Sequence, residues 1–81
     1  MEEKLISKIL EDIDKLDLTV HQLSKKYNKG QKEMENTLKG LEKQKLIEID
    51  YYDEEVGNDE ILEVIMNLYV TNKGKKLINN P

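Results

Sequence analysis

Lysine and amide side chains recur at helical spacing in the segment GQKEMENTLKGLEKQKLI, residues 30–47. If this segment is a helix whose inward row is Met34, Leu38 and Leu41, its opposite side carries no acid. That side consists of four residues, which we call the outer ridge: Lys32, Asn36, Lys39 and Lys43. Lysine reaches phosphate or guanine, and asparagine can make two hydrogen bonds with adenine. The outer ridge therefore indicates contact with duplex DNA, although a lysine-rich helix face is also typical of a merely solvated surface.

Further candidate residues lie close to the outer ridge. Gln31 lies at its edge and has an amide suited to adenine, and three lysines lie within the six residues before it. The candidate DNA-binding residues are thus Lys25, Lys26, Lys29, Gln31, Lys32, Asn36, Lys39 and Lys43. The chain has no arginine, the residue that most often reads guanine, so this inventory favours A·T-rich sites.

Two glutamates, Glu33 and Glu35, lie near the start of the same predicted helix. Helical geometry places them to either side of the outer ridge, and the helix dipole favours carboxylates at this end. Glu35 also precedes Lys39 by four residues, a spacing that supports a helix through ion pairing. Both glutamates therefore have a structural explanation that leaves the outer ridge free of acids.

The strongest charge cluster lies elsewhere in the chain. Residues 46–63 contain eight acids and no base, in a chain of net charge −4, so phosphate groups would repel this segment. We expect it to point away from a bound duplex. The alternative is a protein-interaction module, in which this acidic segment binds a basic partner and the outer ridge is incidental.

Apolar spacing and capping signals predict the helices that position these residues. Residues 1–16 carry a wide apolar stripe at helical spacing. Thr19 followed by Gln22 fits a capping box and predicts that a second helix begins at the next residue. After a tight turn, the third helix is expected over residues 31–45.

Two strands and a short helix are expected after the third helix. Alternation of period two predicts a strand that begins at Ile47, and Gly57-Asn58 predicts the tip of a hairpin. The returning strand is expected from Ile61 to Val70. Thr71 is well placed to cap a last helix.

This order of elements resembles the winged helix-turn-helix family. Residues 23–47 are similar to its helix-turn-helix, with apolar residues at Leu23, Met34, Leu38, Leu41, Leu46 and Ile47. Residues 69–78, YVTNKGKKLI, are similar to the threonine-x-x-glycine-basic ending of bacterial regulators of this type. Lys29 and Lys45 depart from the pattern, which usually has an apolar residue and a glycine there. The resemblance implies one α+β, mainly α domain over residues 1–81: a three-helix bundle, a two-stranded antiparallel wing and a short C-terminal helix.

The resemblance also implies sequence-specific binding of double-stranded DNA through the third helix. A homodimer is expected, because the stripe of the first helix and a returning strand that is apolar on both faces exceed what a small core covers. Its expected interface residues are Leu5, Ile9, Ile61, Ile65 and Tyr69. Two uses remain open: transcriptional repression, or DNA partition as the centromere-binding adaptor of a tubulin-like plasmid or phage system, with a filament-forming motor protein as partner.

Composition argues against other classes of protein. A chain of 81 residues buries too thin a core for a deep catalytic pocket, and it has no cysteine. His21 is the only histidine, so an exposed polar residue is expected there and not a metal ligand. We expect no enzyme activity and no cofactor. The start lacks the features of a signal peptide and no apolar run reaches membrane length, so a cytoplasmic location is expected.

Overall fold

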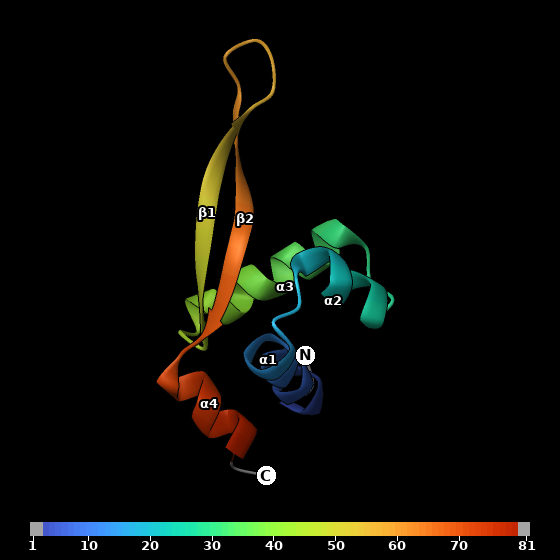
Figure 1. The fold of residues 1–81 in the computed structure, drawn as a ribbon, viewed down its shortest axis with the longest axis vertical. Helices are drawn as coiled ribbons and strands as arrows, with labels where there is room; N and C mark the ends of the chain where they lie inside the picture. Colours follow the sequence, from blue (N-terminus) through green and yellow to red (C-terminus); the bar gives the residue numbers. More distant parts are fainter. Residues whose placement is uncertain (1–2, 80–81) are drawn as a thin grey trace.

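The computed structural model describes residues 3–79, which form four helices and one antiparallel hairpin (Figure 1). The elements are α1 (Glu3–Leu16), α2 (Val20–Lys26), α3 (Gln31–Lys43), β1 (Ile47–Glu55), β2 (Ile61–Val70) and α4 (Asn72–Asn79). The predicted α+β, mainly helical class is confirmed, and the order of elements is compatible with a winged-helix-like arrangement. The first two residues of the helix predicted over residues 1–16 lie outside the described part.

Side-chain caps fix where α2 and α4 begin. Thr19 Oγ1 accepts the N–H of Gln22 at 3.2 Å, and Gln22 Oε1 accepts the N–H of Thr19 at 2.9 Å. This confirms the predicted capping box. Thr71 Oγ1 accepts the N–H of Gly74 at 3.1 Å and caps α4 in the same manner.

One apolar core joins the helices to the base of the hairpin. Its buried members are Ile9, Leu10, Ile13, Val20, Leu23, Met34, Leu38, Leu41, Leu46, Ile47, Ile49 and Leu68. The expectation that Ile9 lies at a dimer interface is wrong, because its side chain is fully buried in the core of its own chain. Leu5 and Ile65, also expected at that interface, are partly buried and pack against the same core.

β1 and β2 pair with one irregularity. Ile49 pairs with Leu68, but Tyr51, two residues further along β1, pairs with Ile65. Met66 is therefore the extra residue of a β-bulge on β2. Because side chains alternate between the two faces of a strand, one extra residue reverses the alternation beyond it.

The bulge changes which residues share a face. Ile65 lies with Leu68 on the side that packs on the core, whereas Tyr69 lies on the opposite, exposed side. Period-two alternation would place the expected interface residues Ile61, Ile65 and Tyr69 on one face of β2, but Tyr69 lies on the other face, so they do not form one apolar surface. A strict period of two does not continue through the bulge.

The distal half of the hairpin extends away from the helices. Residues 52–63 are all exposed, and Figure 1 shows this half standing clear of α1, α2, α3 and α4. The molecule is elongated as a result, with dimensions of 48 × 25 × 21 Å. The tip consists of Gly57, Asn58 and Asp59, all with positive φ, where the sequence predicts the turn.

The link between α3 and β1 lies against the start of α4. A Cβ atom on Gly74 would overlap the carbonyl oxygen of Leu46 and lie 2.7 Å from Val70 Cγ1. Only glycine fits this close approach of two backbones. Within the link, Lys45 has a φ of 62°, a left-handed conformation that favours glycine, which is the residue the resemblance leads one to expect there.

Candidate nucleic-acid interface

α2, a short turn and α3 carry the candidate DNA-binding residues. α2 ends at Lys26 and α3 begins at Gln31, and Asn28 takes a φ of 53° in the turn between them. Gly30 is the N-cap of α3 and provides no side-chain hydrogen bond. The first N–H groups of α3 are therefore left for water or for an anion such as phosphate.

The outer ridge is exposed along α3. Its four side chains are exposed, whereas Met34, Leu38 and Leu41 on the opposite side of the helix are buried. Within residues 3–79, no ion pair involves Lys32, Lys39 or Lys43. Three ammonium groups and one amide are thus presented without a competing protein partner.

The glutamates of α3 make different contacts from those expected. Glu33 accepts a hydrogen bond from Lys29 Nζ at 2.9 Å. Glu35 is half-buried, and the ion pairs of the described residues do not include one between it and Lys39. Lys29 is therefore engaged near its own turn, while Lys39 is left unpaired on the outer ridge.

Lys26 is held by a buried carboxylate. Asp12 of α1 is only 6% exposed, and its Oδ1 accepts a hydrogen bond from Lys26 Nζ at 2.7 Å. Its Oδ2 accepts a hydrogen bond from the hydroxyl of Tyr27, whose ring centroid lies 5.7 Å from the Lys26 ammonium. Burial of the phenol, followed by the hydrogen bond to Asp12, raises the pKa of Tyr27 well above its ordinary value. These contacts fasten the end of α2 to α1, so Lys26 has a structural role.

Asp12 is the residue that the sequence argument misses. It follows Ile9 by three residues and therefore continues the apolar stripe of α1 toward the core. A carboxylate on the buried side of a helix needs a cation or a hydrogen-bond donor from another element. An acid within an apolar stripe is thus the signal that would have identified it.

Gln31 and Lys25 differ in their surroundings. Gln31 lines a cavity between residues 17–21, which comprise the α1–α2 connection and the start of α2, and residues 65–68 of β2. It therefore lies toward the hairpin side of α3, at the edge of the outer ridge. Lys25 is exposed and takes part in none of the ion pairs of the described residues.

A hydrogen bond fastens the base of the hairpin to α3. The hydroxyl of Tyr51 donates to Glu42 Oε1 at 3.0 Å. Burial of the phenol, with the hydrogen bond to Glu42 as the next cause, raises the pKa of Tyr51 to about 12. The direction in which the hairpin leaves α3 is therefore constrained by a specific contact.

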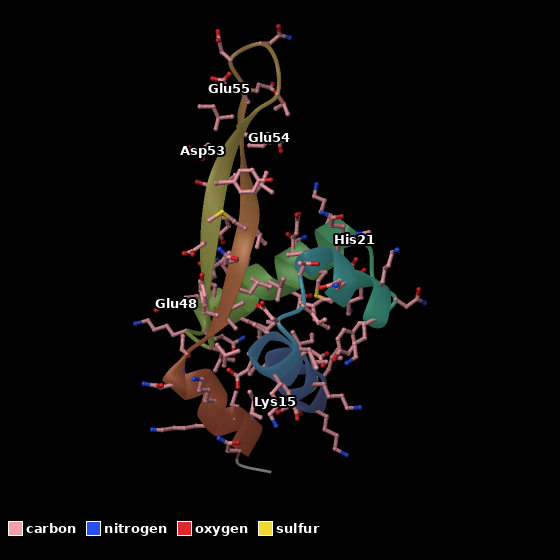
Figure 2. All side chains as sticks on the ribbon, viewed as in Figure 1. Lys15, His21, Glu48, Asp53, Glu54 and Glu55 are labelled. Carbon is pink, nitrogen blue, oxygen red and sulfur yellow. The ribbon has the colours of Figure 1, made fainter. Side chains whose placement is uncertain are left out.

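The acids of residues 46–63 follow the hairpin over its length. Figure 2 shows Glu48 near the base and Asp53, Glu54 and Glu55 toward the distal end. None of the ion pairs of residues 3–79 involves these acids. The hairpin thus presents uncompensated negative charge beside the helix that carries the outer ridge.

His21 and the possible metal ligands are the remaining candidates. His21 is exposed on α2 (Figure 2), and no cluster of three histidines or carboxylates within residues 3–79 is suited to a metal ion. No described helix has the length and apolar character needed to cross a membrane. Comparison of the chain with protein-family models, with curated proteins and with solved structures finds no match.

Proposed function

We propose that this protein is a winged helix-turn-helix protein that binds duplex DNA as a homodimer, with α3 in the major groove. The proposal is carried by the outer ridge, which is exposed and unpaired on a helix whose other side is buried. A recognition helix needs long polar side chains that reach base edges and phosphates while its other side packs on a core. Lys32, Asn36 and Lys39 fit that requirement.

The acidic hairpin restricts how the proposed duplex lies. Distal residues 52–63 contain six acids and no base, so phosphates are repelled from this half of the hairpin. The complex we propose uses the outer ridge, Lys25 and the free N–H groups at the start of α3. The distal hairpin then stays clear of the DNA backbone.

Exposed apolar side chains near the base of the hairpin support the homodimer. At least half of the surface of three such side chains is exposed: Leu16 at the end of α1 (59%), and Met66 (55%) and Tyr69 (50%) on β2. Desolvation of the phenol raises the pKa of Tyr69, and the carboxylates of Asp50 and then Asp17 raise it further. Asp17, which directly follows α1, and Met66 of β2 line the same cavity, so the end of α1 and this part of β2 are neighbours. This region replaces Ile9 as the surface on which we place the second copy.

The proposed use is transcriptional repression or DNA partition in the cytoplasm. Two-fold symmetry predicts a palindromic or repeated site with half-sites about one helical turn apart. The two uses differ in where such sites lie in the genome. Palindromes beside the gene itself indicate repression, whereas a repeat array beside a gene for a filament-forming motor protein indicates partition.

A gel-shift salt series tests DNA binding directly. If a dimer neutralises about eight phosphates with four lysines from each protomer, the logarithm of affinity should fall with a slope of roughly −7 against the logarithm of salt concentration. Absence of any shift at low salt, over a library of genomic fragments, would show that the proposal is wrong.

Two variants with the same change in net charge distinguish DNA contact by the outer ridge from general electrostatic attraction between the protein and DNA. The triple variant Lys32→Ala/Asn36→Ala/Lys39→Ala removes two cations and one amide from the outer ridge and should abolish the shift. The control Lys75→Ala/Lys76→Ala removes two cations from the exposed part of α4 and should retain most of the affinity. Circular dichroism should show the same helix content for both variants. Equal losses of affinity would mean that net charge, and not the outer ridge, determines binding.

A further inference from the structure

The distal hairpin has an open strand edge. The sheet contains two strands, so the outer edge of β2 pairs with no other strand among residues 3–79. Near the base, residues 17–21 and residues 65–68 line one cavity, which places the α1–α2 connection beside this part of the edge. Further out, residues 61–64 have β1 as their only neighbouring element (Figure 1). The open edge is therefore the distal half of β2.

This edge lacks the protection that free strand edges usually have. Edge strands of monomeric proteins are commonly protected by charges, and β1 fits this pattern with five acids in nine residues. The distal half of β2, residues 61–64, is different, since ILEV contains one acid and Ile61 and Leu62 are 61% and 52% exposed. A two-stranded ribbon without a covering layer is only marginally stable in water. A third strand would complete it.

The register gives the distal hairpin two chemically distinct faces. One face, which we call the acidic face, carries Asp53, Glu55, Ile61 and Glu63. The other face, which we call the apolar face, carries Tyr52, Glu54, Leu62 and Val64. On the acidic face, Asp53 and Glu63 are direct cross-strand partners, so two like charges oppose each other with no cation between them.

We propose that the distal edge of β2 binds a basic, extended segment of a partner polypeptide, which adds as a third strand. Lysine or arginine at alternate positions of that segment lies over the acidic face, and apolar residues lie over the apolar face. The main chain of β2 provides the hydrogen bonds, and the two faces provide the selectivity.

The charge of the hairpin determines which kind of partner can bind the open edge of β2. The hairpin has eight acids and no base, so a second hairpin and a nucleic acid are both repelled, whereas a basic segment is attracted. The surface shares no residue with the outer ridge. The proposal therefore stands or fails independently of DNA binding.

Binding of defined peptides to the full chain tests the proposal. The probe is a fluorescein-labelled ten-residue peptide of alternating lysine and valine, measured by fluorescence anisotropy at low salt. The control peptide has the same charge but has proline in place of two central valines, so it cannot continue a hydrogen-bonded strand. We expect the control peptide to bind at least about tenfold more weakly. Backbone amide shifts on addition of the probe should occur at residues 61–64 and not on α3.

Matched variants locate the electrostatic contribution. Asp53→Asn/Glu55→Gln removes two charges from the acidic face and should weaken the probe roughly tenfold. Asp14→Asn/Glu35→Gln removes two charges from the helices and should leave its affinity unchanged. Equal affinities for the two peptides, or equal effects of the two double variants, would reduce the interaction to general charge attraction and overturn the proposal. Shifts at residues 61–64 that depend on protein concentration alone would identify a second copy as the occupant and would also overturn it.

Discussion

The hydroxyl of Thr71 donates a hydrogen bond to the carbonyl oxygen of Lys45, 2.6 Å away, although 26 residues separate them in the sequence. The backbone N–H of Thr71 donates to the carbonyl oxygen of Leu46 at 3.0 Å, and Lys73 Nζ donates to that of Gln44 at 3.0 Å. Three successive carbonyl groups directly after α3 thus accept hydrogen bonds from Thr71, which caps α4, and from Lys73 in its first turn. This set of contacts, which we call the carbonyl clamp, sets the point at which β1 leaves α3.

Gly74→Ala should open the carbonyl clamp. The added Cβ would overlap the backbone oxygen of Leu46, which has no side-chain freedom with which to move away. We expect a loss of about 3 kcal/mol in the free energy of unfolding, measured by urea denaturation.

Gly40→Ala is the matched control for that variant. It makes the same chemical change inside a helix, but nothing lies within 4 Å of the new Cβ. It should stabilise the protein by about 0.5–1 kcal/mol, because alanine loses less backbone entropy than glycine on forming a helix. Similar effects of the two substitutions would contradict the close packing of Gly74.

Asp12→Asn should destabilise the protein by about 1–3 kcal/mol, because it leaves Lys26 and Tyr27 without their charged acceptor on the buried side of α1. Thermal unfolding followed by circular dichroism measures the change. Glu11→Gln is the control, since it removes the neighbouring carboxylate from an exposed ion pair with Lys15 and should cost less than about 0.5 kcal/mol.

Tyr51 should make stability sensitive to alkaline pH. Its pKa is about 12 in the folded protein, above the ordinary value of about 10 for an unfolded chain. The unfolded chain therefore loses this proton first as pH rises. The contribution of the protonated hydroxyl is fully present below about pH 10 and is lost as pH rises to about 12.

The measurement compares urea midpoints at pH 9 and pH 11.5 for the native chain and two variants. Tyr51→Phe should show a smaller decrease than the native chain, because its folded and unfolded states no longer differ at this group. The urea midpoint of Tyr52→Phe should fall as much as that of the native chain. The Tyr52 side chain is exposed, and its hydroxyl forms none of the side-chain hydrogen bonds of the described residues. A native chain with no greater decrease than Tyr51→Phe would argue against the contact with Glu42.

Asp53→Lys should stabilise the distal hairpin. It converts the direct pairing of Asp53 with Glu63 from like to opposite charge, a change of up to about 1 kcal/mol. Glu54→Lys alters net charge equally but lies opposite Leu62, so the difference between the variants isolates the pair. Hydrogen exchange of residues 52–63 measures the local effect. Equal protection in both variants would mean that only the total charge of the hairpin matters.

Local signals explain how much of the fold was predictable. The start of α2 at Val20 is set by a capping box within four residues, and both ends of β2 agree with the prediction from Ile61 to Val70. The helical period likewise predicts that Met34 and Leu38 are buried and that Lys39 is exposed. These features depend on residues close together in the chain.

Tertiary partners explain what the sequence did not reveal. Lys26 and Lys39 have the same side chain in the same type of helix, yet only Lys26 is held by Asp12, because α1 lies beside the end of α2. The bulge at Met66 is a property of the pairing between two strands and leaves no mark on the alternation of β2 alone. Of the candidate DNA-binding residues, Lys26 and Lys29 form ion pairs within the protein. A helical projection of one segment does not show such ion pairs.

The shape of the molecule gives its charge distribution a physical effect at a distance. Residues 46–63 have a net charge of −8 within a chain of net charge −4, and the hairpin forms one end of a body 48 Å long. The helical end therefore has a net positive charge, and the whole protein is an electric dipole along its longest axis. The field of a polyanion exerts a torque on such a dipole and turns the helical end toward it before any contact forms. At physiological salt, screening over about 8 Å confines this pre-orientation to the last step of approach.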